Sequence, residues 1–410
     1  MSRRLSAGHA WGDEYMDKDT ALVCIVGAGP AGLVLAHILH QSNISFVILE
    51  REQSGELRSR TKAGLIEQRA VAALRPFGLA DTITERGGRN GICEFRIDGE
   101  VIVCDYGAPS DDGQGHYIYP QQELVGDWAD ALVAKGGQIR FGVKVVDVAE
   151  NETDVEVRAV TAANDEPFTV RAEAVVACDG AGSVVARAAG FETFEVAHPF
   201  RWLAVIAAIA PPSPRTVYAL HPRGFAGQFR RSATSTRYYL EVPITDKLAD
   251  WPDERIWAEL EERMAIPDQL PLVRGNLIER DFLDLRVRVR EPMQRGRIFL
   301  AGDAAHMVTP AGAKGMNMAI QDAIELAAGL CERYGGAANG DRLGSYTASR
   351  LPDIWRYQEF SNWMLSILHA GPAGQTDKQD FVHRLRRARL DRMINDPVYA
   401  RWFGRTYSGS

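Results

Sequence analysis

The sequence has no apolar run that approaches the ~18 to 20 residues needed to cross a membrane, so we expect no membrane span. It also has no surplus of positive charge. Its formal net charge of −7 argues against a nucleic-acid-binding surface. Residues 1–20 are polar and lack the apolar core of a signal peptide, so we expect them to form a disordered extension of a cytoplasmic protein.

Cysteine is scarce, with five residues and no CxxC pair, and no internal repeat or low-complexity tract is present. Cys24 and Cys178 stand in apolar, strand-like runs, which favours buried reduced thiols over disulfides. We expect no metal site. The length of 410 residues, with 46% hydrophobic and 25% charged residues, is typical of an ordinary globular protein with two or three domains.

The phrase GAGPAG, which runs from Gly27 to Gly32, has the construction of a phosphate site. The apolar run Ala21–Val26 predicts a strand, and Ala31–His40 predicts the helix that follows it. Between them, Gly27 permits a tight turn, Gly29 lets a pyrophosphate approach the backbone, and Gly32 lets the helix lie close to the strand. The helix N-terminus would then offer free N–H groups to the anion.

A second predicted strand, Ile44–Leu49, ends at Glu50, where an acidic side chain would receive a ribose hydroxyl. A glycine pattern alone also suits any tight turn between a strand and a helix. Here the strand, the helix and the acid all have the expected order, so the sequence predicts a Rossmann-like dinucleotide site.

Further along the chain, Glu94–Cys104 predicts a hairpin that turns at Asp98-Gly99, and the strand Arg171–Ala177 runs into a possible cofactor-facing turn at Cys178-Asp179-Gly180. The segment Arg201–Arg290 contains several strand-like runs and one helical stretch, which predicts an inserted, largely antiparallel domain. Other elements are expected at Gln122–Ala134 (helix), Gln138–Val148, Asp154–Val160, Trp202–Ala210, Thr216–His221 and Thr236–Pro243 (strands), and Asp253–Met264 (helix).

A second glycine-rich phrase, GDAAHMVTPAGAKGMN, follows the predicted strand Arg297–Ala301. Asp303, beside glycine at a strand end, is well placed to accept hydrogen bonds from polyol hydroxyls, although it could also cap the next helix. Helices are expected over Met316–Tyr334 and much of Pro352–Tyr407.

Three strand-end turns, GAGPAG, CDG and GDAAH, occur together with HPRGFA at 221–226, RSAT at 231–234 and RYYLEVP at 237–243. From residue 20 to the C-terminus, the chain resembles the para-hydroxybenzoate hydroxylase family of single-component, FAD-dependent aromatic hydroxylases. The resemblance implies a mixed α/β fold with a Rossmann-like FAD-binding domain over 21–195, an antiparallel substrate-binding sheet domain over 196–290, and a segment over 291–410 that completes the FAD site and continues into C-terminal helices.

The implied reaction uses NADH or NADPH to reduce the flavin, and O2 then gives a flavin hydroperoxide. This electrophile transfers one oxygen to the ring carbon ortho to a phenol. The resemblance also implies the residues that hold FAD. They are Gly27, Gly29, Ala31, Gly32 and Glu50 on the adenosine side, Arg60, Lys62, Gly64, Leu65 and Gln121 near the phosphate, ribityl chain and ring, Asp179 and Asp303 at strand-end turns, Met316 and Asn317 beside the isoalloxazine, and Arg237, which would keep the flavin in its reactive position.

For the aromatic acid substrate, the resemblance assigns the phenolic oxygen to Tyr218, with Tyr407 as the second tyrosine of a proton relay. A tyrosine hydroxyl both donates and accepts, so it can stabilise a phenolate while it passes a proton. Arg231 and Tyr239 would bind the carboxylate, since a guanidinium offers two parallel donors. The Pro310 carbonyl would contact the substrate oxygen, and Trp202 would pack near the pocket. Taken alone, each tyrosine could be a packing residue and each arginine a surface ion pair.

Three departures from the family pattern bear on the substrate. Phe229 replaces a carboxylate-binding serine, Asn90 replaces the histidine at the outer end of the proton relay, and Lys62 replaces a flavin-site arginine. The nicotinamide cofactor would contact Arg286 and the segment 51–60. Glu56 in that segment would repel a 2′-phosphate, which favours NADH or dual use.

Two other classes stay open at this point, a flavin oxidoreductase that inserts no oxygen and a non-enzymatic dinucleotide-binding regulator. The aromatic C-terminal helices would suit the interface of a homodimer.

Overall fold

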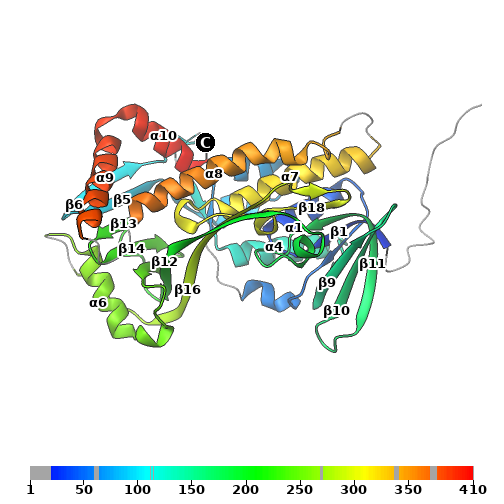
Figure 1. Cartoon of the computed structure of the whole chain (residues 1–410), viewed down its shortest axis with the longest axis horizontal. Helices are drawn as coiled ribbons and strands as arrows, with labels where there is room; N and C mark the ends of the chain where they lie inside the picture. Colours follow the sequence, from blue (N-terminus) through cyan, green and yellow to red (C-terminus); the bar gives the residue numbers. More distant parts are fainter. Residues whose placement is uncertain are drawn as a thin grey trace, which may run out of the picture.

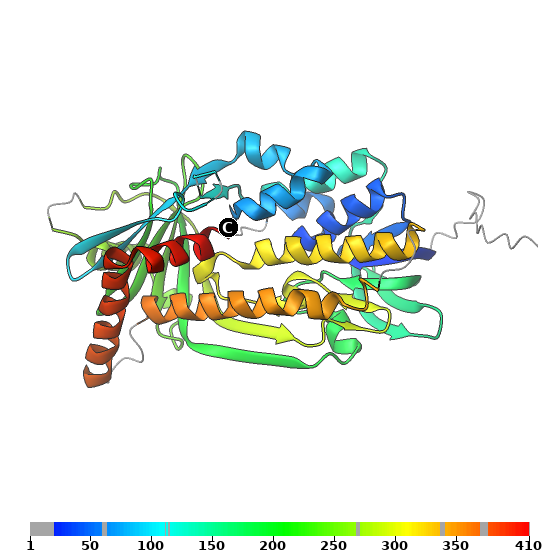
Figure 2. The ribbon, with the colours of Figure 1, turned by 90° about the horizontal axis from the view of Figure 1, so that it is seen from above.

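The computed structural model describes residues 20–59, 64–110, 112–113, 115–267, 271–336, 341–369 and 376–409. Figure 1 shows two β-sheets side by side, with the long helices α7 (Gly315–Tyr334) and α8 (Tyr346–Leu368) above them. From above, these two helices run alongside each other (Figure 2).

The first sheet contains the predicted nucleotide-binding unit. Its strand order is β17-β18-β11-β1-β2-β8, and the four pairs from β18 to β8 are parallel. Fully buried apolar residues dominate β1 and β2, as expected for parallel strands covered on both faces. The strands are β1 (Thr20–Val26), β2 (Phe46–Leu49), β8 (Ile139–Arg140), β11 (Pro167–Ala177), β17 (Gln294–Arg295) and β18 (Ile298–Leu300), with β9 (Val143–Glu150) and β10 (Val155–Thr161) antiparallel beside β11.

The second sheet is antiparallel apart from one strand pair, β13 with β5. One of its faces packs on α8, α9 and α10, and the other packs on α6. In strand order it consists of β19 (His306–Met307), β16 (Leu277–Arg290), β12 (Thr193–Ala207), β15 (Thr236–Val242), β14 (Gly224–Arg230), β13 (Thr216–His221), β5 (Ile92–Ile97) and β6 (Glu100–Asp105).

A small third sheet, β3-β7-β4, lies at Leu65–Ile66, His116–Ile118 and Gly88–Asn90. The remaining helices are α1 (Pro30–Gln41), α2 (Gln68–Leu74), α3 (Asp81–Arg86), α4 (Gln121–Ala134), α5 (Val184–Ala188), α6 (Asp253–Met264), α9 (Thr376–Asn395) and α10 (Pro397–Ser408). Short 3-10 turns are η1 (Ser54–Arg58), η2 (Arg75–Phe77), η3 (Leu248–Asp250), η4 (Gly302–Ala304) and η5 (Pro310–Gly312).

Two elements differ from the sequence predictions. The predicted strand Gln138–Val148 is divided into β8 and β9, because Gly142 between them has a positive φ of 66° that a regular strand cannot accommodate. The hairpin β5–β6 turns at Asp98-Gly99 as expected, but it pairs with β13 of the second sheet, although its sequence position is inside the segment 21–195.

None of the helices in the described part of the chain is long and apolar enough to span a membrane. None of the five cysteines, all of which lie in the described residues, forms a disulfide bond.

Candidate active site

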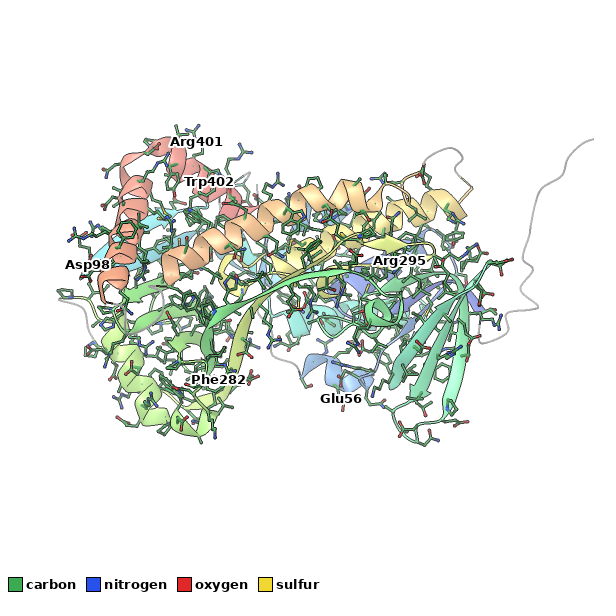
Figure 3. The ribbon with its side chains drawn as sticks, in the orientation of Figure 1. Glu56, Asp98, Phe282, Arg295, Arg401 and Trp402 are labelled. Carbon is green, nitrogen blue, oxygen red and sulfur yellow. The ribbon has the colours of Figure 1, made fainter. Side chains whose placement is uncertain are left out.

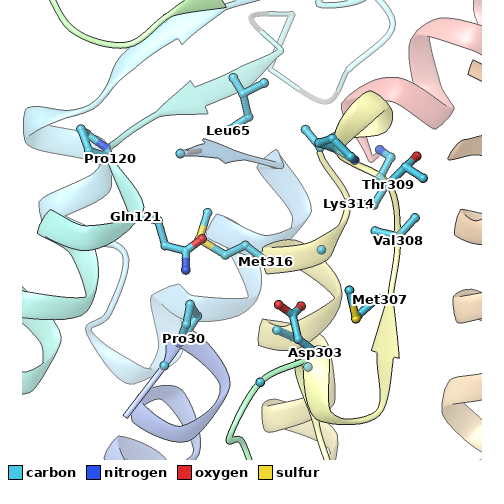
Figure 4. A pocket seen from close by; sticks show the side chains of 18 of the residues that line it. Pro30, Leu65, Pro120, Gln121, Asp303, Met307, Val308, Thr309, Lys314 and Met316 are labelled. Carbon is cyan, nitrogen blue, oxygen red and sulfur yellow. The ribbon is translucent and has the colours of Figure 1, made fainter. Parts of the chain in front are cut away.

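A cavity of about 470 Å³ extends from the turn between β1 and α1 to the ends of β14 and β15 (Figure 4). Both glycine-rich phrases contribute to its wall, which explains how segments from opposite ends of the chain form one site. The sequence-predicted residues that line it are Gly29, Ala31, Gly64, Leu65, Gln121, Phe229, Arg231, Arg237, Tyr239, Asp303, Pro310 and Met316.

The first glycine turn has the backbone geometry that its sequence predicts. Gly27 has a φ of 102°, and a Cβ at this position would lie 2.4 Å from the carbonyl oxygen of Cys178. At Gly32, a Cβ would lie 2.0 Å from the Gly27 carbonyl oxygen, so only glycine lets α1 approach the turn. Helix α1 has no side-chain cap and no acid in its first turn, so its N-terminal amides are available to an anion.

Two predicted cofactor carboxylates bond to backbone amides instead of lining the cavity. Glu50 accepts from the amides of Ala28, at 2.6 Å, and Glu52, at 3.0 Å. Asp179 accepts from Val184 N at 2.8 Å at the start of α5, and burial raises its pKa. Each carboxylate therefore shapes a turn at the edge of the cavity.

The second glycine-rich phrase is held by a buried acid that the sequence analysis missed. Asp322 accepts from the Gly302 amide at 3.0 Å, and its carboxylate also meets His306 Nε2 at 2.6 Å and Arg350 Nε at 2.8 Å. Although burial opposes ionisation, His306 and Arg350 lower the pKa of Asp322 to about 2. Asp303 itself lines the cavity from a 3-10 turn. Helix α7 begins only at Gly315, so the alternative that Asp303 caps the next helix is wrong.

Asn317 lies behind the cavity wall and joins its own segment to residues 65–67. Its Nδ2 donates to the carbonyls of Leu65, at 3.2 Å, and Ala313, at 2.8 Å, and its Oδ1 accepts from Glu67 N at 2.9 Å. Figure 4 shows its neighbour Met316 beside Gln121 at the cavity.

Tyr218 and Tyr407 meet in the buried core of the second sheet. Their hydroxyl oxygens are 2.5 Å apart, and each residue is 1% exposed. Burial is the main cause that raises the pKa of both phenols, so both carry their protons near neutral pH. Neither tyrosine lines the cavity.

Phe229 lies between the cavity and this tyrosine pair. Its ring meets Tyr218 edge-on, with centroids 5.5 Å apart, and meets Tyr239 edge-on at 5.3 Å. Phe229 lines the cavity, whereas Tyr218 does not. An aromatic ring therefore stands where a serine hydroxyl was expected.

Two guanidinium groups, Arg231 and Arg237, line the same part of the cavity. Burial, and then the neighbouring positive charge of Arg237, lower the pKa of Arg231. Arg237 Nη1 donates to the Tyr239 hydroxyl at 3.4 Å. A bound anion would reduce the repulsion between the two cations, so this part of the cavity is suited to a carboxylate.

Other predicted residues lie away from the cavity or outside the described residues. Trp202 packs on Tyr239, with ring centroids 5.0 Å apart, and its Nε1 donates to His369 Nε2 at 3.1 Å. Arg286 is exposed on β16, 3.8 Å from Glu195. Arg60 and Lys62 lie outside the residues that the structure describes.

Lys314 and its partners were also missed, although Lys314 belongs to the second glycine-rich phrase. Its side chain is fully buried, and its Nζ donates to Glu67 Oε1 at 2.6 Å and to the carbonyls of Thr406, at 2.7 Å, and Tyr407, at 2.9 Å. A buried lysine needs such partners. A lysine within a glycine-rich phrase was therefore a signal from which this buried charge could have been predicted.

The glycine turn, the amides of α1 and the elongated cavity fit a dinucleotide, and Asp303 provides a polar acceptor further along the wall. The fold and the cavity thus define a dinucleotide-binding protein. In agreement, residues 20–361 match the family described as FAD binding domain.

The chain is 32% identical to a p-hydroxybenzoate hydroxylase from Acinetobacter baylyi, over 94% of this chain and 95% of the relative. It is 28% identical to a 3-(3-hydroxy-phenyl)propionate/3-hydroxycinnamic acid hydroxylase from a Mycobacterium species, over 82% of this chain but only 58% of that relative. A solved structure of p-nitrophenol 4-monooxygenase from Pseudomonas putida has a TM-score of 0.77 and 21% identity, and covers 93% of this chain and 99% of the other.

The chain belongs to the FAD-dependent aromatic hydroxylases that include p-hydroxybenzoate hydroxylase. It is a flavoprotein monooxygenase of mixed α/β fold.

Proposed function

We propose that this enzyme hydroxylates a phenolic aryl acid, 4-hydroxybenzoate or a modified relative, at the carbon ortho to its hydroxyl. The observation that carries the proposal is the contact between Tyr218 and Tyr407, only one ring away from a cavity that holds Arg231 and Arg237. Two cations on the cavity wall would suit the acid of such a molecule, and the tyrosine pair behind Phe229 could relay the proton of its phenol.

When bound, FAD would supply the electron transfer and the oxygen activation. The residues of this chain would bind, orient and deprotonate the substrate. Arg231 and Tyr239 would hold the acid, and the Pro310 carbonyl would lie beside the ring oxygen. Tyr218 would accept the phenolic proton as it gives its own to Tyr407, and Tyr407 would release its own hydroxyl proton to water, so that the ring becomes more electron-rich.

A substrate panel tests the proposal. With the FAD-loaded protein and NADH, one hydroxyaryl acid should accelerate NADH oxidation and give a dihydroxy product that carries one ¹⁸O atom from ¹⁸O₂. A product without label would indicate an oxidoreductase that inserts no oxygen. If every acid yields only hydrogen peroxide, or none accelerates NADH oxidation, the proposal is wrong.

Phe229 is expected to set which acid is accepted. Replacement by serine removes the ring that packs on Tyr218 and Tyr239, and adds a hydroxyl donor for a carboxylate. We expect Phe229→Ser to raise kcat/KM for 4-hydroxybenzoate by about 10-fold, the value of roughly one hydrogen bond to a charged group. The measurement is the ratio of kcat/KM for 4-hydroxybenzoate to that for the best wild-type substrate. An unchanged ratio would show that Phe229 does not select the substrate.

We also propose that the enzyme uses NADH, alone or together with NADPH, as its electron donor. Glu56 is exposed on η1, where it accepts from the Gln53 amide at 2.8 Å (Figure 3). The nearby cation Arg58 is occupied by Glu123, Asp127 and Asp130 at 2.7 to 3.1 Å, so it is not available to a 2′-phosphate.

The exchange Glu56→Gln is expected to raise kcat/KM for NADPH several-fold, because it removes a negative charge, and to leave the value for NADH nearly unchanged. Glu85→Gln, on the exposed surface of α3, is the control. A wild-type enzyme with a strong preference for NADPH would contradict this assignment.

A cytoplasmic location and a homodimer stay predictions from the sequence. Sedimentation of the FAD-loaded protein would measure the oligomeric state.

A further inference from the structure

The C-terminal end of α10 is fixed by two buried side chains from distant parts of the chain. The last carbonyls of a helix have no partner within it. Here the Tyr407 carbonyl accepts from His116 Nε2, at 2.8 Å, as well as from Lys314 Nζ, at 2.9 Å. His116 lies on β7 and is fully buried. The strand and the helix are thus joined at the residue whose hydroxyl meets Tyr218.

The aromatic ring of Tyr407 is held as firmly as its backbone. The His116 ring meets it at 72°, with centroids 5.2 Å apart, and Tyr106 meets it edge-on at 4.6 Å. Phe403, one turn earlier in α10, stacks on it at 5.4 Å. These contacts leave little rotational freedom for the Tyr407 side chain, so its hydroxyl is held at 2.5 Å from that of Tyr218.

His116 is also the direct cross-strand neighbour of Asn90, the residue that stands where a titrating relay histidine was expected. Asn90 is committed to structure, because its Nδ2 donates to Thr216 and its Oδ1 accepts from the Tyr106 hydroxyl. This chain therefore has a histidine one strand away from the expected place, bonded to the backbone of the relay tyrosine.

We propose that His116 is a neutral positioning residue that clamps Tyr407 against Tyr218, in place of a histidine that titrates within the relay. A carbonyl oxygen only accepts, so Nε2 must carry the hydrogen, and Nδ1 has no partner among the described residues. The charged groups that face His116 are Lys314 and Arg89, both cationic. Burial, and then Lys314, lower the pKa of His116 to about 3, so the imidazole stays neutral throughout the range in which the enzyme would be assayed.

The proposal rests on the proposed function only for its effect on turnover. The clamp itself can be measured without substrate, by hydrogen–deuterium exchange of the peptide 399–409 in the FAD-loaded, full-length protein. His116→Leu removes the donor and should accelerate exchange in this peptide several-fold. His116→Gln, whose amide can donate to the same carbonyl, should restore most of the protection. The surface variant His383→Leu, on α9, should leave exchange unchanged.

For turnover, His116→Leu should lower kcat of the best substrate by about 10-fold, while its KM changes by less than threefold. In a Tyr407→Phe background, the same exchange should lower kcat by less than twofold, because there is no hydroxyl left to position. We expect the plot of kcat against pH for the wild type to contain no step between pH 6 and 7 that is caused by His116. Such a step would be recognised because it is present in the wild type and lost in His116→Leu.

A step of that kind would show that His116 titrates and would overturn the proposal. An equal loss of kcat in both backgrounds, or unchanged exchange of 399–409, would do the same. If exchange responds as expected but no hydroxyaryl acid is turned over, the proposed function fails and the clamp stands. His116→Gln also covers the case in which His116→Leu does not fold.

Discussion

Tyr218→Phe is expected to lower the rate of coupled ring hydroxylation by roughly 10²- to 10⁴-fold, the range associated with the loss of a positioned acid–base group. The phenylalanine keeps the ring, which stacks on Phe95 with centroids 5.1 Å apart, and removes only the hydroxyl. A phenolic substrate would then lose its proton acceptor, while the acid would still be held by Arg231. KM should therefore change much less than kcat, and a larger share of the NADH oxidised should appear as hydrogen peroxide.

The matched control is Tyr238→Phe. Tyr238 is a buried tyrosine of the same sheet, on β15, but it belongs to the cluster that faces α6, where its ring meets Trp257 at 5.7 Å. Its hydroxyl lies on the opposite face of the sheet from the cavity, so coupled turnover should be close to that of the wild type. If Tyr218→Phe keeps more than a third of the coupled rate, Tyr218 does not exchange the phenolic proton.

The same exchange leaves the Tyr407 hydroxyl buried without its partner. Such a group costs about 1 to 3 kcal/mol of folding free energy. The thermal midpoint of the variant should thus fall by a few degrees. A circular dichroism melt would separate this structural loss from the much larger loss of activity.

Much of the fold was accessible from the sequence because local signals agreed with one another. The strand β1, the glycine turn and α1 all lie where periodicity and glycine spacing place them, and Asp98-Gly99 turns the hairpin. The strand that pairs with this hairpin could not be predicted from the sequence. Strand pairing with β13 depends on contacts between segments far apart in sequence, which no local pattern encodes.

The candidate site shows the same division. The cavity brings together twelve of the predicted residues. Gly29 and Asp303 were predicted from strand-end turns whose backbone must face a ligand, whereas others, such as Phe229, Arg231 and Tyr239, were implied only by the family resemblance. The sequence analysis did not identify Asp322, Lys314 or His116. Each forms a hydrogen bond with a backbone amide or carbonyl group that only the folded chain brings close to it. An isolated charged residue in an otherwise apolar or glycine-rich phrase is the sequence signal that indicates residues such as Asp322 and Lys314.

Arg231→Gln is expected to reduce kcat/KM for the aryl acid by about 10² to 10³, equivalent to roughly 3 to 4 kcal/mol at 1.4 kcal/mol per tenfold change, within the range for truncating a buried charge pair. Arg237 lines the same part of the cavity, so one cation would remain and some affinity for the acid should persist. The loss should appear mainly in KM, because the contact to the acid is present in both the bound substrate and the transition state.

A neutral analogue makes this expectation specific. For 4-hydroxybenzamide, which has the phenol but no negative charge, Arg231→Gln should change kcat/KM by less than threefold. Arg223→Gln, whose guanidinium lies 3.5 Å from Glu259 and from Glu262 on α6, controls for a general change in charge and should affect neither compound. Equal losses for the acid and the amide would show that Arg231 maintains the cavity and does not read the carboxylate. A loss confined to the acid would locate the substrate's charge beside Arg231, at the end of β14.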